Sequence, residues 1–428
     1  MSEKYNCIVH YDVTATCVSP LRTANADGDT EMVLRRADGT AIIQGSSLAG
    51  AMKHFAAQEW TLTRAEELFG SQKAESRLIV SDGVFAKTAE MQMRPRICID
   101  AAYGSVKNKF DVAHIGVGEV FDFSVTWRGN SLDSDDIICV ERIFAAIQSG
   151  ALCFGAQKSN GFGQVSLSVK KGLYDLREEK ARRAWLDEAP EWRKTIELAQ
   201  YAPRQVIFEI SGKTNSILVK ASAPELQTAE NGKNVSTAVA VNIKENGKSI
   251  LPGSSVKGAV RARAEMIAEY LKLPNDSNGI VSRMFGCGSV GREDNGVPGR
   301  VWFEDAVLDD TAKTITRIRI NRFTGGVMNG ALIKEEPHSS SIRLRIKADG
   351  SPEQCALLLL ALRDLGLGLY TLGSGGVIGR GYVTVEKITV KLPDGRTGSL
   401  SFDKEKHCAI DDQAGIFPAW LKELEALK

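Results

Sequence analysis

The sequence predicts an α+β protein built from two tandem ferredoxin-like units, and three observations support this fold class. Several sequence blocks of the first half recur in the second half in the same order. Within each half, the apolar residues indicate the β-α-β-β-α-β order of the split ferredoxin-like unit. The length of 428 residues suits two domains of ordinary size.

The repeated blocks keep a nearly constant separation along the chain, which is typical of an internal duplication. In the first copy they are residues 43–50 (IQGSSLAG), 68–70 (LFG), 76–82 (SRLIVSD), 96–100 (RICID) and 155–163 (GAQKSNGFG). In the second copy they are residues 251–258 (LPGSSVKG), 284–286 (MFG), 299–305 (GRVWFED), 317–321 (RIRIN) and 373–381 (GSGGVIGRG).

A charged segment separates the two copies. Residues 172–204 are rich in Arg, Glu and Lys and contain Pro190 and Pro203, which is typical of a connector exposed to solvent. The sequence therefore predicts a first domain over residues 1–171, a charged helical linker over residues 172–204, and a second domain with a C-terminal extension over residues 205–428.

The elements of each copy follow from the spacing of its apolar residues. Alternation predicts opening strands around residues 7–15 and 206–210, and helical spacing after each Gly-Ser-Ser predicts a helix with a serine as N-cap. The later elements are strands around residues 121–127 and 342–346, helices around 134–149 and 352–365, and closing strands around 165–169 and 383–390.

The composition is that of a soluble globular protein, with 43% hydrophobic residues, 25% charged residues and a net charge of +1. Any surface for nucleic acid must therefore be local. The 8 cysteines are scattered without zinc-site spacing, and no apolar stretch approaches the roughly 18 residues of a membrane span. We expect a cytoplasmic protein with reduced cysteines and no membrane partner.

The two Gly-Ser-Ser motifs are candidate phosphate sites. A helix N-terminus presents free backbone N–H groups and a positive dipole end, which suit a phosphate. For a single motif, ordinary helix capping is the more common explanation. Two occurrences, each followed by a further glycine at Gly50 or Gly258, strengthen the binding interpretation, and Lys257 adds a charge in the second copy. The candidate residues are Gly45, Ser46, Ser47, Gly253, Ser254, Ser255 and Lys257.

The two glycine loops match neither common phosphate-binding motif. A dinucleotide fingerprint needs a strand before the loop and a helix after it, whereas here a helix precedes and a strand follows. No Gly-Lys-Ser/Thr closes either loop as in a P-loop. Small residues would let another backbone come close, with Lys158 or Arg380 supplying charge. A purely structural turn remains the alternative.

Asp27 and Asp29 form an Asp-Gly-Asp triplet in the polar stretch before the first helix. Two carboxylates there could hold a hydrated Mg²⁺ or orient a hydroxyl for phosphoryl transfer, although most such triplets are turns. The 5 histidines do not recur at equivalent positions. Shared histidine catalysis in the two copies is therefore not expected.

In their combined order, these blocks resemble the RAMP (repeat-associated mysterious protein) superfamily of CRISPR systems. The narrower resemblance is to backbone subunits of type III effector complexes, and two units in one chain resemble the fused subunits of type III-D. The resemblance implies two RNA-recognition-motif-like domains with loop and thumb insertions. It also implies binding of guide CRISPR RNA and target RNA, assembly with other RAMP-family subunits and with large and small subunits, and a role in antiviral defence.

The resemblance also assigns candidate site residues. It implies that an aspartate upstream of the first Gly-Ser-Ser cuts target RNA with Mg²⁺ or Mn²⁺; Asp29 fits best as catalyst and metal ligand, and Asp27 is second. The equivalent position of the second copy is Thr237, so cutting there is in doubt. The implied RNA-binding residues beyond the helix starts are Lys158, Ser159, Gly161, Gly163, Arg322, Gly379, Arg380 and Gly381. The implied thumbs lie in residues 101–115 and 322–337.

Other functions stay open at this point. A non-catalytic RNA scaffold would use the same binding residues, with Asp27 and Asp29 as turn residues. A guide-processing endonuclease of the same superfamily would commonly need histidine as acid or base, and the histidines do not recur. A small-molecule enzyme is disfavoured because no cofactor motif occurs in its required structural context.

Overall fold

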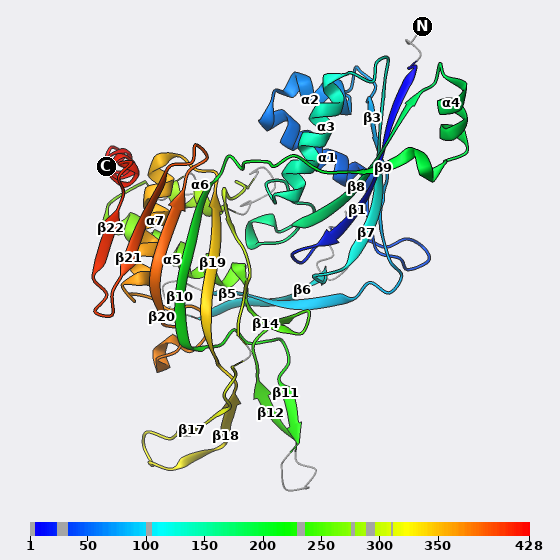
Figure 1. Ribbon diagram of the computed structural model, residues 1–428. Helices are drawn as coiled ribbons and strands as arrows, with labels where there is room; N and C mark the ends of the chain where they lie inside the picture. The colour runs from blue at the N-terminus through cyan, green and yellow to red at the C-terminus, as the bar shows by residue number, and fades with distance from the viewer. Residues whose placement is uncertain are drawn as a thin grey trace. The chain divides into compact units, whose positions relative to one another are not determined.

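The computed structural model describes residues 5–23, 33–99, 105–228, 236–274, 279–287, 296–309 and 311–428. The chain divides into two compact units (Figure 1). Unit 1 comprises Met1–Met93, Val112–Lys158 and Phe162–Pro203, and unit 2 comprises Arg94–Asp111, Ser159–Gly161 and Arg204–Lys428. Two short segments encoded by the first sequence copy therefore belong to unit 2.

Unit 1 is an antiparallel sheet with its main helices on one face and a later short helix on the other. Its central strand β1 (Cys7–Cys17) lies between β7 (Val120–Gly129) and β8 (Val165–Asp175). The sheet order is β2-β4-β7-β1-β8-β9, with β3 also beside β7. The remaining elements are β2 (Ile42–Ile43), β3 (Leu78–Val80), β4 (Gly83–Phe85), β9 (Arg193–Ile196), α1 (Gly45–Glu59), α2 (Leu62–Phe69) and α3 (Asp135–Gln148).

The predicted alternation explains why β1 is the centre of this sheet. Tyr11, Val13 and Ala15 point to the helical side and are almost completely buried, in one cluster with Leu48 of α1 and Phe144 of α3. Because side chains alternate across a strand, the polar residues between them reach the opposite face.

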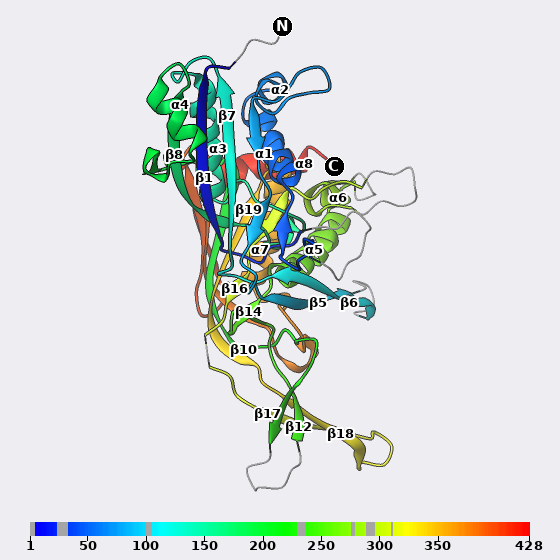
Figure 2. The same cartoon turned by 90° about the vertical axis from the view of Figure 1, so that its right-hand side faces the viewer.

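Unit 2 repeats this arrangement and extends it. Its central strand β10 (Val206–Ile217) lies between β19 (His338–Ala348) and β20 (Val383–Lys391), and the sheet order is β15-β19-β10-β20-β21-β22. The other strands of the sheet are β15 (Val301–Phe303), β21 (Thr397–Phe402) and β22 (Cys408–Asp411). The helices are α5 (Gly253–Tyr270), α6 (Ile280–Phe285), α7 (Pro352–Gly366) and α8 (Ile416–Glu425). The sheet lies in front of α5 and α7 in Figure 1 and is seen from the side in Figure 2.

Smaller sheets and hairpins extend from these cores. One sheet joins β11 (Glu225–Thr228), β12 (Ser236–Ala240), β18 (Val327–Glu335) and β17 (Ile315–Ile320), and another joins β13 (Lys244–Glu245), β14 (Lys248–Leu251) and β16 (Ala306–Val307). β5 (Met91–Ile99) pairs with β6 (Val106–Ile115) as a hairpin. The implied thumb regions thus include strands β6 and β18.

The two sheets share one topology. β3-β7-β1-β8 in unit 1 and β15-β19-β10-β20 in unit 2 are the same antiparallel order, with helices α1 and α3 or α5 and α7 in the crossovers. This is the ferredoxin-like order, and the predicted α+β tandem is confirmed. In unit 2, the strands β21 and β22 and the helix α8 follow this shared topology.

Residues 172–204, for which the sequence predicts a solvent-facing helical linker, pack on unit 1. They contain the end of β8, α4 (Glu179–Leu186), the short helix η2 (Pro190–Trp192) and β9, which pairs with β8. Ala184 of α4 packs against Ile8 and the fully buried Tyr174. Among the described residues, no helix is long and apolar enough to span a membrane.

Candidate nucleic-acid interface

Each Gly-Ser-Ser motif starts a helix, but the predicted serine N-cap is wrong. The N-cap residues are Gln44 and Pro252, and neither contributes a side-chain cap. An aspartate takes over this role. Asp82 accepts a hydrogen bond of 2.8 Å from the Gly45 backbone N–H.

Unit 2 repeats the bond, since Asp305 accepts one of 2.7 Å from Gly253. A negative charge is favourable at a helix N-terminus. The recurring aspartate at the end of the blocks at 76–82 and 299–305 is therefore structural.

The two glycines allow the helix starts to approach a strand end closely. A Cβ atom on Gly45 would overlap the carbonyl oxygen of Val80, and one on Gly253 would overlap that of Phe303. Both contacts are with backbone, which cannot move aside like a flexible side chain. The first glycine of each motif is thus required for packing, and no ligand is needed to explain it.

The serines lie in the first helical turn. Ser46 and Ser47 are exposed, and Ser254 and Ser255 are half-buried. The first turn of a helix leaves backbone N–H groups without intrahelical partners. Because Asp82 and Asp305 bind the preceding glycine, an anion would meet the N–H groups of Ser46 and Ser254 next to that carboxylate.

Gly50 and Gly258 are different, because nothing in the described part of the chain requires them. Both lie in the exposed second turn of their helices, at matched repeat positions. A Cβ atom on either would meet no described atom within 4 Å, apart from the local chain itself. Glycine in a helix interior costs about 0.5–1 kcal/mol relative to alanine. Within the described residues, these two exposed helix glycines thus have no packing reason.

The glycine loops of the two copies have the same geometry. Gly163 and Gly381 have φ values of 88° and 74°, and a Cβ on either would overlap the carbonyl oxygen of Phe154 or Leu372. The same residue pairs are joined by backbone hydrogen bonds of 2.9 Å. These contacts account for both glycines as turn residues, so the turn alternative explains their recurrence.

The first glycine loop meets the second helix start within unit 2. Lys257 Nζ donates a hydrogen bond of 2.9 Å to Ser159 Oγ. A Cβ on Gly161, which has a φ of 86°, would lie 2.6 Å from the Phe303 carbonyl oxygen, which also limits Gly253. The structure therefore brings together Ser159, Gly161, Gly253 and Lys257, which the sequence assigns to two separate motifs.

Lys257 is held in a positively charged setting. Burial, together with repulsion from the nearby Arg261 and Arg96, lowers the pKa of its ammonium group to about 8. In unit 1, burial likewise lowers the pKa of Lys158, while Cys153 opposes that shift. A partly buried cation among cations favours an anionic ligand, whose charge would relieve the repulsion.

The sequence reasoning missed Arg94. This residue of β5 belongs to unit 2, is 1% exposed, and donates to Asp305 at 2.7 Å and to Glu245 at 2.8 Å. Burial alone would lower the pKa of Arg94, but the two carboxylates raise it. Arg94 thereby fixes the carboxylate that holds Gly253. The sequence signal that could have indicated such a contact was the recurrence of an aspartate, Asp82 and Asp305, at the end of two matched blocks.

Arg380 of the second glycine loop faces a carboxylate. It is 5% exposed and donates to Glu335 of β18 at 2.7 Å, and Glu335 also accepts from Arg317 and Lys220 at 3.0 and 2.9 Å. Burial opposes ionisation of Glu335, but these cations lower its pKa to about 2. This cluster joins the glycine loop to the β17–β18 hairpin. Gly379, next to Arg380, has a φ of 84°.

Arg322 lies apart from this cluster. It is exposed in the turn between β17 and β18, beside Phe323, which is 99% exposed. The β17–β18 turn therefore presents one cation and one aromatic ring to solvent.

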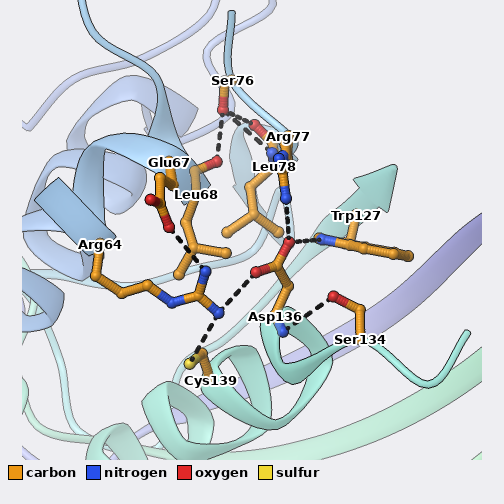
Figure 3. A network of polar contacts seen from close by, with 10 residues as sticks. All are labelled: Arg64, Glu67, Leu68, Ser76, Arg77, Leu78, Trp127, Ser134, Asp136 and Cys139. Atoms are coloured by element: carbon orange, nitrogen blue, oxygen red, sulfur yellow. Dashed lines mark hydrogen bonds and ion pairs between the residues drawn. The ribbon is translucent and has the colours of Figure 1, made fainter. Parts of the chain in front are cut away.

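A further buried carboxylate in unit 1 is structural. Asp136, at the start of α3, is 2% exposed and binds Arg64, Arg77 and the Trp127 indole N–H at 2.7, 3.0 and 2.9 Å (Figure 3). Ser134 Oγ accepts from the Asp136 backbone N–H at 3.2 Å. Buried charges that are paired in this way hold elements together, here α2, α3, β7 and the residue just before β3.

The predicted catalytic residues Asp27 and Asp29 lie outside the described residues. Thr237 lies in β12. No group of three or more His, Cys, Asp or Glu side chains suited to a metal ion occurs in the ranges that the structure describes.

Comparison with known proteins follows the duplication. The family model of the RAMP superfamily matches residues 14–166 and 213–384. No curated protein matches the sequence. Among solved structures, a chain of "Cryo-EM structure of the Type III-B Cmr-beta bound to cognate target RNA" is similar, with 15% identity and a TM-score of 0.32. That match covers 40% of this chain and 61% of the other, so the chain spans less than two thirds of its relative. Because the family model covers most of the sequence in two tandem regions, the chain belongs to the RAMP superfamily.

Proposed function

We propose that this protein is a guide-RNA-binding backbone subunit of a type III CRISPR effector complex, with each unit contacting successive parts of one RNA. Membership of the RAMP superfamily supports this assignment. The observation that carries it is the pair of exposed glycines, Gly50 and Gly258, in the second turns of α1 and α5. Glycine in an exposed helix costs stability, and no contact among the described residues requires it at either position, so its recurrence favours a ligand that approaches both helices from outside.

An RNA backbone fits that description. Phosphates favour the N-terminal end of a helix, and a glycine there lets a sugar or phosphate lie directly against the helix backbone. In unit 2, Lys257 lies on α5 next to Gly258. It is near the cations Arg261 and Arg96, and it donates a hydrogen bond to Ser159 of the first glycine loop. The chain would contact the phosphates and sugars of the RNA, and the target sequence would be recognised by base pairing with the guide.

The proposal includes one cutting site per chain. Asp29, with Asp27 as second choice, would cut target RNA at the first repeat together with Mg²⁺ or Mn²⁺. RNA supplies its own 2′-hydroxyl nucleophile, so a carboxylate and a divalent metal that stabilises developing charge would be sufficient. The second repeat would bind without cutting, because Thr237 supplies no carboxylate. The proposed partners are guide RNA, target RNA and other effector subunits, in the cytoplasm.

RNA extraction from the purified protein tests the assignment. The chain is expressed with a CRISPR array, purified at moderate and at high salt, and its nucleic acid is sequenced. We expect a discrete short RNA with common ends that carries spacer sequence. Random fragments of cellular RNA, or no RNA at either salt concentration, would contradict guide binding. A protein that carries the guide and shows no metal-dependent cutting in the assembled complex would be the non-catalytic scaffold.

A further inference from the structure

The sheet of unit 2 has one face that its helices do not cover. Phe208 and Ile210 of β10 point to the helical side and are buried. The alternate residues of β10, β19 and β20 point the other way, and we call this the outer sheet face. In Figure 1 this face is turned to the viewer, with α5 and α7 behind it.

The outer sheet face is rich in cations. Its accessible basic side chains are Lys213, Arg343, Arg345, Lys387 and Lys391, and its carboxylates are Glu209, Glu304 and Glu386. These three carboxylates are all engaged in ion pairs, whereas Asp411 at the β22 edge of the same face is exposed and forms none within the described residues. Lys213 pairs with Glu386 at 3.1 Å, Lys391 pairs with Glu209 at 2.8 Å, and Glu304 binds the buried Lys347 at 3.0 Å and Arg345 at 3.5 Å.

Two cations remain for a ligand. Arg343 and Lys387 are exposed, and within the described parts of the chain neither forms an ion pair. Both lie opposite Ser211, on the strands to either side of β10. With strands roughly 4.8 Å apart, their Cα atoms are separated by about 10 Å with a hydroxyl between them.

An aromatic ring lies on the same face. Trp302 of β15 is half-buried and lies opposite Lys347 of β19, one strand outside the row of cations. Aromatic side chains beside cations are the usual elements of single-strand binding, because bases stack on the ring while phosphates meet the charges.

The corresponding face of unit 1 is closed. There α4 covers β1 and β8 through the cluster of Ile8, Tyr174 and Ala184, and the Trp185 ring lies 5.5 Å from that of His10. Arg193 pairs with Asp12 at 3.1 Å on the same face. The duplicated sheets therefore differ, since one outer face is covered by a helix and the other is open and basic.

We propose that the outer sheet face of unit 2 binds single-stranded RNA as a second contact surface, separate from the helix starts and glycine loops. This inference rests on the proposed RNA-binding function and adds a surface to it. The surplus of cations and the unpaired Arg343 and Lys387 provide phosphate contacts, and Trp302, one strand across from β19 and four residues along from Arg343, provides a stacking platform further along the same face. An acidic protein segment would match the charges, but it would make no use of a stacking platform.

Salt-dependent binding of labelled oligouridine to the full-length protein tests the proposal. The double variant Arg343→Gln and Lys387→Gln should lower affinity and flatten the slope of log affinity against log salt by about 0.7 for each lost phosphate contact. Trp302→Leu should lower affinity without changing the slope. The control double variant, Lys180→Gln and Lys422→Gln, removes the same charge from exposed sites on α4 and α8 and should leave both unchanged.

The outcomes separate this inference from the proposed function. If the wild-type protein binds no RNA, both fail. If Lys257→Gln weakens binding while the Arg343 and Lys387 double variant matches wild type in affinity and slope, only the outer-face inference is overturned. Equal losses in the double variant and its control would also overturn it, because they would reflect net charge alone.

Discussion

Asp305 accepts a hydrogen bond of 2.7 Å from the backbone N–H of Gly253, so the carboxylate that ends one repeated block fixes the helix that begins another. Asp82 and Gly45 repeat this relationship at 2.8 Å. The duplication has thus preserved a strand-to-helix contact as well as an order of elements. Each helix start is held by a carboxylate from the neighbouring strand end.

The copies differ in the cation beside that aspartate. Arg94 is almost completely buried against Asp305, whereas Arg36 lies 3.7 Å from Asp82 with its side chain 46% exposed. Arg94→Met should destabilise unit 2 by about 3–5 kcal/mol, because it leaves the buried Glu245 and the partly buried Asp305 without their cation. Arg36→Met should cost less than about 1 kcal/mol.

Hydrogen–deuterium exchange resolves the two sites in one experiment. We expect faster exchange at the amides of the α5 start in Arg94→Met and unchanged exchange at the α1 start in Arg36→Met. Equal protection of the α5 start in Arg94→Met and wild type would show that Arg94 does not hold it.

Lys257 should make RNA binding depend on pH. Its pKa in the free protein is lowered to about 8, and a bound phosphate would raise it by stabilising the charged form. Binding then takes up a proton above about pH 8, so affinity should fall as pH rises beyond that value and stay constant below it. Lys257→Arg, which stays charged, should remove the dependence. An identical pH profile in the two proteins would exclude phosphate contact at Lys257.

Glu335 should stabilise unit 2 in a pH-dependent way. Its pKa is lowered from 4.5 to about 2, so its stabilising effect is complete above about pH 4.5 and is lost as pH falls towards 2. Glu335→Gln should cost about 3–5 kcal/mol at pH 7, since it leaves the cations around it unpaired. The difference from wild type, measured by urea unfolding of unit 2, should shrink below pH 4.5. A difference that is constant from pH 7 to pH 3 would contradict the linkage.

Asp29→Ala should abolish metal-dependent cutting of target RNA at the first repeat and leave guide content unchanged, because one carboxylate contributes little to holding a polyanion. Mapping the ends of target fragments in the assembled complex should show one cut per chain, lost in this variant. Asp38→Ala, which removes a half-exposed carboxylate from a turn nearer the helix, is the control. Survival of every product in Asp29→Ala would exclude it as the catalyst.

Local patterns predicted most of the fold. Apolar alternation located β1, β10, β7 and β19, and the repeated blocks established two copies of one topology. The serine N-cap was wrong because the Gly-Ser-Ser sequence is compatible with capping, whereas the actual cap comes from an aspartate distant in sequence. Arg94 was missed for the same reason, since no periodicity shows that a strand of the first copy packs into unit 2. Contacts between residues far apart in the sequence cannot be predicted from the pattern of neighbouring residues.

The measurement that tests the account most directly is guide-RNA affinity in Gly50→Ala and Gly258→Ala. Each change removes a helix-interior glycine from an exposed position and should stabilise its unit by about 0.5–1 kcal/mol. If RNA lies against both helices, the added methyl groups must also displace it, so each variant should bind more weakly while being more stable. Thr63→Ala, at an exposed site on α2, should be more stable with unchanged affinity. Gly50 and Gly258 variants that gain stability and bind guide RNA like wild type would contradict the central claim.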